Sequence, residues 1–404
     1  MNRENKRMTI IGIIVLIFAN SAAGGAEWCS SALADIANTF PDVPYWVITL
    51  VNNIPNFCAV VFTVVAGVLV NRKISLRNMI LIGIGCHAVG GVLPALAGSS
   101  SMAMMFIGRF AFGVGYGLMQ GIGVSMSFKL VENPKLRVHA MGWAVAAQYA
   151  MNMIAQVVVG KLVAIQWNYA FFIYMWSFIP FAVVFFLCPH FEVDVNDLSA
   201  VGGKGSSLGE KSVMRSVIAL PSSVWIITVI VAVYMLCYYP MFLVIAPVIV
   251  GRGFGQAVDV GVAMIFYSVA TIAGGIIFGI VEKVCKEKTI CIFLVGVALS
   301  LVGLYLSHSY VEVCAWLTFS GITSTGIIPA CINSFNKTVP ESESFLATGI
   351  MESGVNIGAF LGTPFIAAVE AFNIDVATTL VISPVVLVLM GIATIRLFSK
   401  KRSV

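Results

Sequence analysis

Residues 102–128 read MAMMFIGRFAFGVGYGLMQGIGVSMSF, and in this run of 27 residues Arg109 is the single charged side chain. A helix needs about 20 apolar residues to cross the roughly 30 Å of hydrocarbon in a bilayer, and a barrel strand needs only about 10. The run therefore predicts a membrane-spanning helix, and eleven other stretches share its character. The twelve predicted spans are 9–36, 44–70, 78–98, 102–128, 138–164, 169–188, 224–250, 256–281, 289–307, 311–335, 345–370 and 376–397.

Composition and charge distribution support the same interpretation. Of the 404 residues, 59% are hydrophobic and only 10% are charged, which is far from a soluble domain. All but three of the 23 Lys and Arg fall in the termini, the central connector or alternate loops; the exceptions are Arg109, Lys161 and Arg252. Because Lys and Arg resist translocation, this bias predicts cytoplasmic N- and C-termini. The net charge of +5 then reflects membrane orientation and predicts no nucleic-acid partner.

Two similar halves are predicted on either side of one polar connector. The turn at 67–77, after the second span, has an echo at 279–288, offset by 212 residues from Gly67 to Gly279. We predict an N-terminal six-helix bundle over 1–188, a cytoplasmic linker over 189–222 and a C-terminal six-helix bundle over 223–404. Repeated halves with a site between them near the membrane midplane are a recurrent plan of secondary transporters.

The turn after the second span resembles a motif of the major facilitator superfamily. That family carries G-x-L-x-D-R-x-G-R-K there, and this chain has Gly67, Leu69, Arg72 and Arg77, with Asn71 in place of the Asp. By this resemblance Gly67, Asn71, Arg72 and Arg77 form a cytoplasmic gate motif, in which the arginines secure the contacts of one state.

A second motif extends the resemblance, which covers essentially the whole chain. Residues 109–117, RFAFGVGYG, are similar to the R-x-x-x-G-x-G-x-G pattern of the same family. The resemblance implies an all-α membrane protein with the fold of that superfamily, in which two pseudo-symmetric six-helix bundles surround a central cavity. Spans one, four, seven and ten would line the cavity, and span three would lie outermost.

Charged side chains inside the spans point to energy coupling. Glu27, Arg109 and Glu352 would each cost at least about 2.5–3.5 kcal/mol at bilayer depth, so each should face the protein interior or a water-filled cavity. Glu27 would share a helical face with Asn20 and Gly24. A carboxylate that moves between a guanidinium and apolar surroundings can bind and release a proton. The resemblance implies such coupling here, with Glu352 as a secondary group. A static ion pair between spans one and four, and hydration of Glu352 near the cytoplasmic end, are the alternatives.

Polar and aromatic side chains at helical spacing complete the predicted cavity. Helix-to-helix contacts are an equally open use of the amides among them. His87, in the outermost third span, is predicted to pack in the core. The predicted cavity residues are Asn20, Trp28, Tyr116, Gln120, Gln148, Asn152, Tyr238 and Asn356.

We predict a secondary active transporter of a small organic solute, working by alternating access and coupled to protons, such as an exporter of drugs, amphiphiles or metabolites. The alternative is uptake or exchange of an organic anion whose carboxylate is held by Arg109, which Ala155-Gln156 favours because proton and drug antiporters of the family usually carry Gly-Pro there. The protein is predicted to be a multi-pass monomer of the plasma (inner) membrane. No constellation of an enzyme, metal site or cofactor is predicted.

Overall fold

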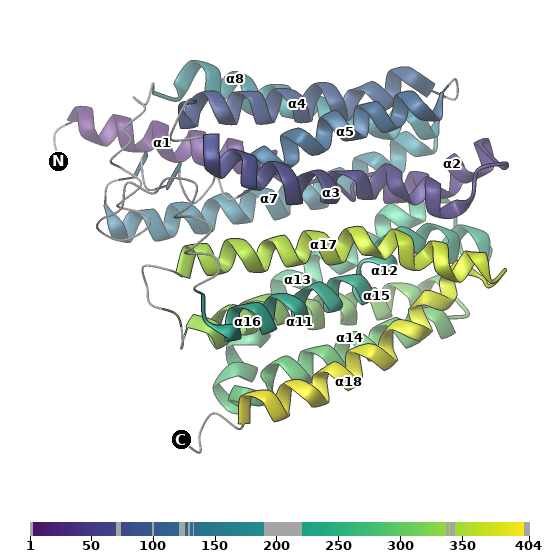
Figure 1. Ribbon diagram of the computed structural model, residues 1–404. Helices are drawn as coiled ribbons and strands as arrows, with labels where there is room; N and C mark the ends of the chain where they lie inside the picture. The colour runs from purple at the N-terminus through teal and green to yellow at the C-terminus, as the bar shows by residue number, and fades with distance from the viewer. Residues whose placement is uncertain are drawn as a thin grey trace. The chain divides into compact units, whose positions relative to one another are not determined.

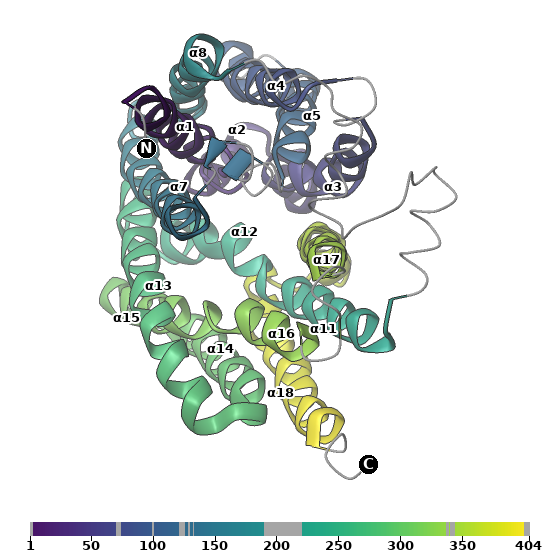
Figure 2. The ribbon, with the colours of Figure 1, turned by 90° about the vertical axis from the view of Figure 1, so that its left-hand side faces the viewer.

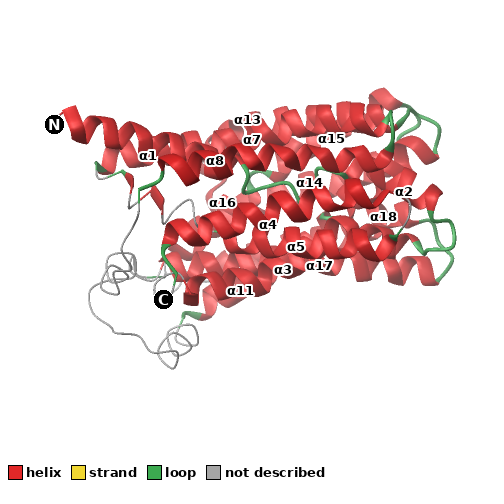
Figure 3. Ribbon diagram, turned by 90° about the horizontal axis from the view of Figure 1, so that it is seen from above, coloured by secondary structure: helices red, strands yellow, loops and turns green. Residues whose placement is uncertain are grey.

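The computed structural model describes all residues except 1–2, 70–73, 99–100, 121–125, 128–129, 132, 190–219, 337–338, 340–343 and 400–404. The described residues form helices and loops, with no strand among them (Figure 3). Ten helical segments in this part of the chain are long and apolar enough to cross a membrane, and Arg7–Ser21 is a shorter apolar helix. The predicted all-α membrane class is confirmed. Most of the predicted linker, 190–219, lies outside the described residues.

The chain forms two compact units. The first comprises Met1–Cys29 and Leu50–Ser207, and the second comprises Ser30–Thr49 and Leu208–Val404. Residues 30–49, which include the end of the first predicted span and the start of the second, therefore belong to the second unit, although they lie in the N-terminal part of the sequence. The chain passes from one unit to the other after Cys29 and again after Thr49.

The N-terminal helix α1 lies beside other helices of the first unit (Figure 1). Within this unit α4 packs against α5 and against the 3-10 helix η3, while α1 packs against α7 and α8. The elements are α1 (Arg3–Ser21), α3 (Tyr45–Leu69), α4 (Leu76–Ala97), α5 (Met102–Met119), α7 (Pro134–Val163), η3 (Trp167–Ser177) and α8 (Phe178–Leu187).

The second unit repeats several of these helix pairings and adds the pairing of α13 with α15 (Figure 2). Here α11 packs against α17, α13 against α15, and α14 against both α15 and α18. Its elements are η1 (Ser30–Ala32), α2 (Leu33–Thr39), α11 (Ser222–Tyr238), α12 (Pro240–Ala246), the π-helix η4 (Pro247–Gly251), α13 (Ala257–Cys285), η5 (Lys286–Lys288), α14 (Thr289–Leu306), α15 (Tyr310–Ser324), α16 (Ile327–Asn336), α17 (Ser344–Ala371), η7 (Val376–Thr378) and α18 (Thr379–Ser399).

The internal repeat seen in the sequence recurs in this packing. The helix α3 begins at Tyr45 and α13 begins at Ala257, which is the same offset of 212 residues. The pair α4 and α5 in the first unit corresponds to α14 and α15 in the second, and the pair α1 and α7 corresponds to α11 and α17. Each unit thus builds its own bundle from equivalent helix pairs.

Close backbone approach between α4 and α5 places the predicted Arg109 beside α4. A Cβ atom added to Gly115 would lie 2.3 Å from the carbonyl oxygen of Gly83, so a side chain cannot fit at this position. Small residues at such contacts let membrane helices pack backbone to backbone. Gly115 of the RFAFGVGYG motif therefore packs α5 against α4, whereas added Cβ atoms at Gly113 and Gly117 would meet Cys58 and Phe62 of α3.

The fourth, seventh and tenth predicted spans are each interrupted or shortened. The seventh span is divided into α11, α12 and η4, because Pro240 lacks an N–H group to continue the helix. The tenth is divided into α15 and α16 at Thr325 and Gly326, where Gly326 packs on the ring of Phe293. The helix of the fourth ends at Met119, so Gln120 has an extended backbone and lies beyond the predicted helical face.

Candidate functional site

A break in the first predicted span forms the centre of the candidate site. The helix α1 ends at Ser21, whose hydroxyl group donates a hydrogen bond to the carbonyl of Phe18 at 2.7 Å, and helical structure resumes at Ser30. Gly25 has a φ of +103°, which residues with a Cβ rarely adopt. The prediction of one continuous helix over 9–36 is wrong for this reason. Glu27 accordingly lies in an unwound segment, residues 22–29, and not on a helical face shared with Asn20.

Three consecutive carbonyl groups of this unwound segment accept hydrogen bonds from side chains. The Nε2 atom of His87 lies 3.0 Å from the carbonyl oxygen of Gly24, and the hydroxyl group of Tyr174 donates to that of Gly25 at 2.6 Å. The Nη2 atom of Arg109 donates to the carbonyl of Ala26 at 2.8 Å. The three side chains come from α4, η3 and α5, and each of them is fully buried.

The guanidinium group of Arg109 donates hydrogen bonds to backbone carbonyls and to a hydroxyl group. Its Nε atom donates to the carbonyl of Val51 on α3, and Nη1 donates to the hydroxyl oxygen of Tyr174 at 3.0 Å. The guanidinium carbon also lies 4.3 Å from the ring centroid of Phe112. The charge of Arg109 acts electrostatically on the carboxyl group of Glu27. The hydrogen bond from Arg109 to Ala26 holds the backbone next to Glu27, so the two predicted coupling residues are neighbours in the first unit.

Trp28 and two amides of α7 fasten the other end of the segment. The indole Nε1 of Trp28 donates to Oδ1 of Asn152 at 2.8 Å, and its ring stacks on Tyr174 with centroids 5.5 Å apart. A Cβ atom on Gly24 would lie 3.1 Å from Asn152 Oδ1 and 3.3 Å from Gln148 Nε2, so both amides adjoin the break. Trp28, Gln148 and Asn152, which were predicted separately, are brought together.

Asn20, Tyr116 and Gln120 are the other predicted cavity residues of the first unit. Asn20 donates a hydrogen bond to the carbonyl of Leu16, four residues earlier in α1, at 2.8 Å. The ring of Tyr116 stacks on Phe112, with centroids 6.2 Å apart. Gln120 follows the end of α5.

A separate group of hydroxyls contains the predicted Tyr238 in the second unit. The Tyr238 hydroxyl group lies 3.2 Å from that of Tyr267 and 3.1 Å from that of Ser320, and its ring stacks on Tyr234. On α17 the side chain of Asn356 donates to the carbonyl of Glu352 at 3.0 Å. Glu352 itself is half-buried.

The loop motif is only partly visible. Gly67 is in α3, whereas Asn71 and Arg72 lie outside the described residues. Arg77 is buried, and its Nη2 donates to the carbonyl of Phe185 at 2.6 Å, near the C-terminal end of α8. A cation is favoured at a helix C-terminus, so in this unit Arg77 joins α4 to α8.

Sequence reasoning missed two members of the site. His87 was expected to pack in the core, and it is fully buried, yet both ring nitrogens have hydrogen-bonding partners: Gly24 at 3.0 Å and the Ser177 hydroxyl at 2.9 Å. Tyr174 was not singled out. The local signal for both was the pair Gly24-Gly25 within an apolar run, since a break there leaves carbonyl groups that need partners.

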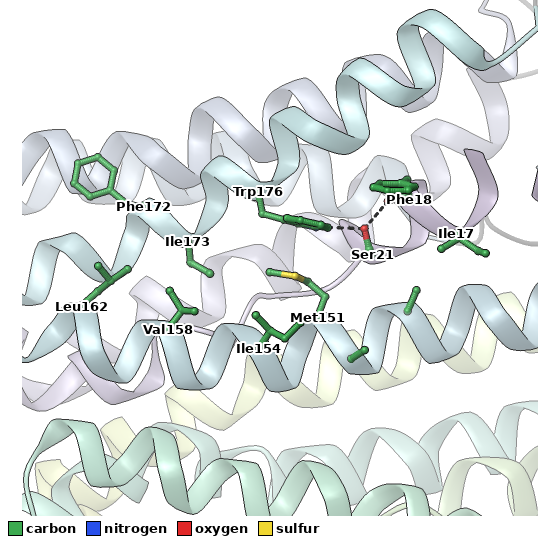
Figure 4. Close-up of a pocket in the computed structure, with 12 residues that line it drawn as sticks. Ile17, Phe18, Ser21, Met151, Ile154, Val158, Leu162, Phe172, Ile173 and Trp176 are labelled. Atoms are coloured by element: carbon green, nitrogen blue, oxygen red, sulfur yellow. Dashed lines mark hydrogen bonds between the residues drawn. The ribbon is translucent and has the colours of Figure 1, made fainter. Parts of the chain in front are cut away.

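An apolar cavity of 540 Å³ adjoins the break (Figure 4). It lies between α1, α7 and η3, and its lining includes Phe18, Met151 and Trp176. The hydroxyl of Ser21 accepts a hydrogen bond from Trp176 Nε1 at 3.3 Å, so the polar atoms at this point are paired. None of the residues predicted from sequence line this cavity. Among the described residues no cluster of His, Cys, Asp and Glu is suited to hold a metal ion.

Comparisons with known proteins agree on one family and fold. The sequence model of the Major Facilitator Superfamily matches residues 9–283 and 231–404. A search of curated proteins found no match.

Several solved structures are similar over nearly their whole length. A D-xylose-proton symporter aligns with a TM-score of 0.74 and 12% identity, over 95% of this chain and 97% of that chain. The nucleoside transporter NupG aligns with 0.73 and 13%, over 98% and 99%. A mutant of the peptide transporter POT aligns with 0.73 and 10%, over 99% of each chain. At such identities the likeness concerns the fold alone.

Proposed function

The chain belongs to the Major Facilitator Superfamily, and from that premise we propose that it moves a small organic solute across a membrane by proton-coupled alternating access. Glu27 is the proposed proton-binding group, Arg109 is its electrostatic partner, and Glu352 has a secondary role. The protein is proposed to export an amphiphile or metabolite from a cell, as a transporter and not as an enzyme. We place it in the plasma membrane as a monomer with both termini in the cytoplasm.

One observation carries the proposal: a carboxylate and a fully buried guanidinium adjoin a break in the first predicted membrane-spanning segment. Glu27 lies between residues whose backbone or side chain is fixed, and it feels the charge of Arg109. Ionisable residues at such depth mark ion or proton pathways in transporters. Irregular backbone at membrane depth is typical of transporter binding sites. One structural neighbour is by its name a proton symporter, which supports the plausibility of proton coupling on this fold.

The apolar cavity and the hydrogen bonds of Arg109 indicate the class of solute. The cavity of 540 Å³ beside α1 is apolar and has a size typical of sites for small organic ligands. This favours a neutral or cationic amphiphile. The alternative, an organic anion held by Arg109, has less support because Arg109 is fully buried and donates to Ala26, Val51 and Tyr174.

The test is a proton-flux measurement on purified protein in liposomes that contain the pH dye pyranine. A proton gradient is imposed, and tetraphenylphosphonium, ethidium, benzoate or salicylate is added. We expect an organic cation to evoke proton flux in the wild type and in Glu312→Gln, a matched control that changes a carboxylate at the start of α15. The flux should vanish in Glu27→Gln.

Two results would overturn parts of the proposal. If Glu27→Gln moves solute uphill as well as the wild type does, Glu27 is not the coupling residue. If radiolabelled benzoate exchanges without proton movement while the cations give no response, the organic-anion alternative replaces the exporter.

A further inference from the structure

We infer that His87 and Tyr174 are positioning residues for Glu27: with Arg109 they hold the unwound segment 22–29 by its carbonyl groups, and we call the three side chains the carbonyl clamp. The inference rests on the proposed role of Glu27 in coupling. It assigns a function to two side chains outside the predicted site, one of which the sequence had placed among ordinary packing residues.

The backbone carbonyl groups at the break need hydrogen-bonding partners. In a continuous helix the backbone carbonyls accept hydrogen bonds from N–H groups of the same helix. Where a helix is broken inside the membrane, these carbonyls have neither intrahelical partners nor water. In this segment the carbonyls of Gly24, Gly25 and Ala26 all accept hydrogen bonds from buried side chains. The donors come from three different elements, and the Gly25 carbonyl also accepts a longer hydrogen bond, of 3.4 Å, from the backbone N–H of Trp28. The unwound conformation therefore depends on the carbonyl clamp.

The hydrogen-bonding groups of Tyr174 and His87 are both fully used. The Tyr174 hydroxyl donates to Gly25 and accepts from Arg109 Nη1 at 3.0 Å and from the thiol of Cys29 at 3.7 Å. A carbonyl can only accept, so the hydrogen of His87 is on Nε2, facing Gly24, and Nδ1 is then paired with the Ser177 hydroxyl. A neutral imidazole satisfies both contacts. His87 thus serves the segment as a fixed donor and needs no change of protonation.

The carbonyl clamp is connected to Glu27 through the residues on either side of it in the sequence. The peptide group that precedes Glu27 carries the Ala26 carbonyl, which Arg109 holds, and the residue that follows is Trp28, which Asn152 holds. Trp28 also stacks on Tyr174, and the His87 ring lies 4.2 Å from that of Phe112. Both neighbours of Glu27 are therefore anchored, and loss of one clamp donor frees the backbone that carries its carboxyl group.

Few other titratable or charged groups face this site in the described residues. The surrounding elements supply Arg109 from α5, His87 from α4, Tyr174 from η3, Cys58 from α3 and Cys29 from the segment itself, while α7 contributes the neutral amides of Gln148 and Asn152. A change in proton binding by Glu27 on mutation of the clamp is thus a change in its burial, in its backbone hydrogen bond or in its position relative to Arg109.

The first arm of the test measures backbone order without any solute. Amide hydrogen exchange of residues 20–30 is followed by mass spectrometry in the full-length protein. His87→Leu and Tyr174→Phe each remove one donor, and we expect exchange to become about tenfold faster. His87→Gln keeps an N–H near the position of Nε2 and should exchange like the wild type. Tyr169→Phe, on the same η3 helix, is the matched control.

The second arm measures the proton on Glu27 itself. The infrared carbonyl band of a protonated carboxyl group is titrated and is assigned to Glu27 by its loss in Glu27→Gln. We expect His87→Leu and Tyr174→Phe to move the titration midpoint by about one pH unit, whereas His87→Gln leaves it in place. If His87→Leu does not fold, Tyr174→Phe retains the ring and decides the question.

Each other outcome has a definite meaning. Wild-type exchange and titration in both donor-removing variants would reduce His87 and Tyr174 to packing residues and overturn the inference. A shifted titration in His87→Gln despite normal exchange would make His87 a proton carrier, which also overturns it. If the wild type has no band that depends on Glu27, the proposed coupling fails and positioning of Glu27 fails with it, while the exchange arm still shows whether the clamp exists.

Discussion

At the scale of single residues, Arg109 shows how one membrane-buried cation can be made structural. Burying a charge is costly unless hydrogen bonds replace its hydration. The planar guanidinium reaches Ala26, Val51 and Tyr174 at once, which joins the unwound segment, α3 and η3. A Lys ammonium has no such fixed fork, so Lys is a poor substitute here. Under the proposed function, this fixed position lets Arg109 act on the charge of Glu27.

Gly25 is the residue where the break is most sensitive to a side chain. Its φ is +103°, and an added Cβ would lie 2.8 Å from ring atoms of Trp28. We expect Gly25→Ala to destabilise the protein by about 1–3 kcal/mol through backbone strain and the displaced indole. The thermal unfolding midpoint of the purified protein in one detergent is the measurement.

Gly142→Ala is the matched control for that substitution. Gly142 lies within the helix α7, where an added Cβ would meet no atom within 4 Å. Here alanine should be neutral or stabilise by up to about 1 kcal/mol. If Gly25→Ala unfolds at the wild-type temperature while Gly142→Ala behaves as expected, the segment 22–29 does not keep the described conformation.

At the scale of elements, uniform apolar spans could be predicted from sequence and interrupted ones could not. The span predicted at 289–307 is α14 (Thr289–Leu306), and that predicted at 345–370 is α17 (Ser344–Ala371), because polar turns bound each run. The break after Ser21 is different, because His87 and Tyr174, whose hydrogen bonds stabilise it, are remote in sequence. Trp28 and Asn152 could be predicted as polar or aromatic members of spans, but their mutual hydrogen bond could not.

The helix α3 begins with a cap that comes from a distant helix. The backbone N–H groups of Tyr45 and Trp46, the first two residues of α3, donate to the two carboxylate oxygens of Glu370 at 2.8 and 2.9 Å. A carboxylate at a helix N-terminus accepts hydrogen bonds from N–H groups that have no intrahelical partner, and it interacts favourably with the helix dipole. We expect Glu370→Gln to lower the free energy of unfolding by about 1 kcal/mol and to make amide exchange of residues 40–49 several-fold faster.

Asp259→Asn provides the matched control for the cap. Asp259 accepts a hydrogen bond from the N–H of Gln256 at 2.7 Å, so it caps α13 from within the same turn. The same acid-to-amide change should raise exchange only around residues 255–260. Unchanged exchange of residues 40–49 in Glu370→Gln would show that the long-range cap contributes nothing to the order of this segment.

At the scale of the whole molecule, α3 is shared by both compact units. Its residues up to Thr49 belong to the second unit, and its residues from Leu50 onward belong to the first. The hydroxyl of Tyr45 donates to the carbonyl of Leu243 at 2.6 Å, which adds a tie between the start of α3 and α12. Under the proposed alternating access the two units change their relative position, so the start of α3 either leaves the second unit or bends away from the rest of its helix.

A reversible cross-link decides between these two possibilities. The hydroxyls of Thr49 and Thr363 lie 3.1 Å apart and both residues are buried, so cysteines at the two positions are within reach of a disulfide. We expect Thr49→Cys with Thr363→Cys, in a background without the nine native cysteines, to lose proton-coupled transport on oxidation and regain it on reduction. Each single variant under the same oxidant is the control. Wild-type transport by the fully cross-linked protein would mean that residues 30–49 stay with the second unit throughout the cycle, and the required bend would then lie within α3 at or beyond Leu50.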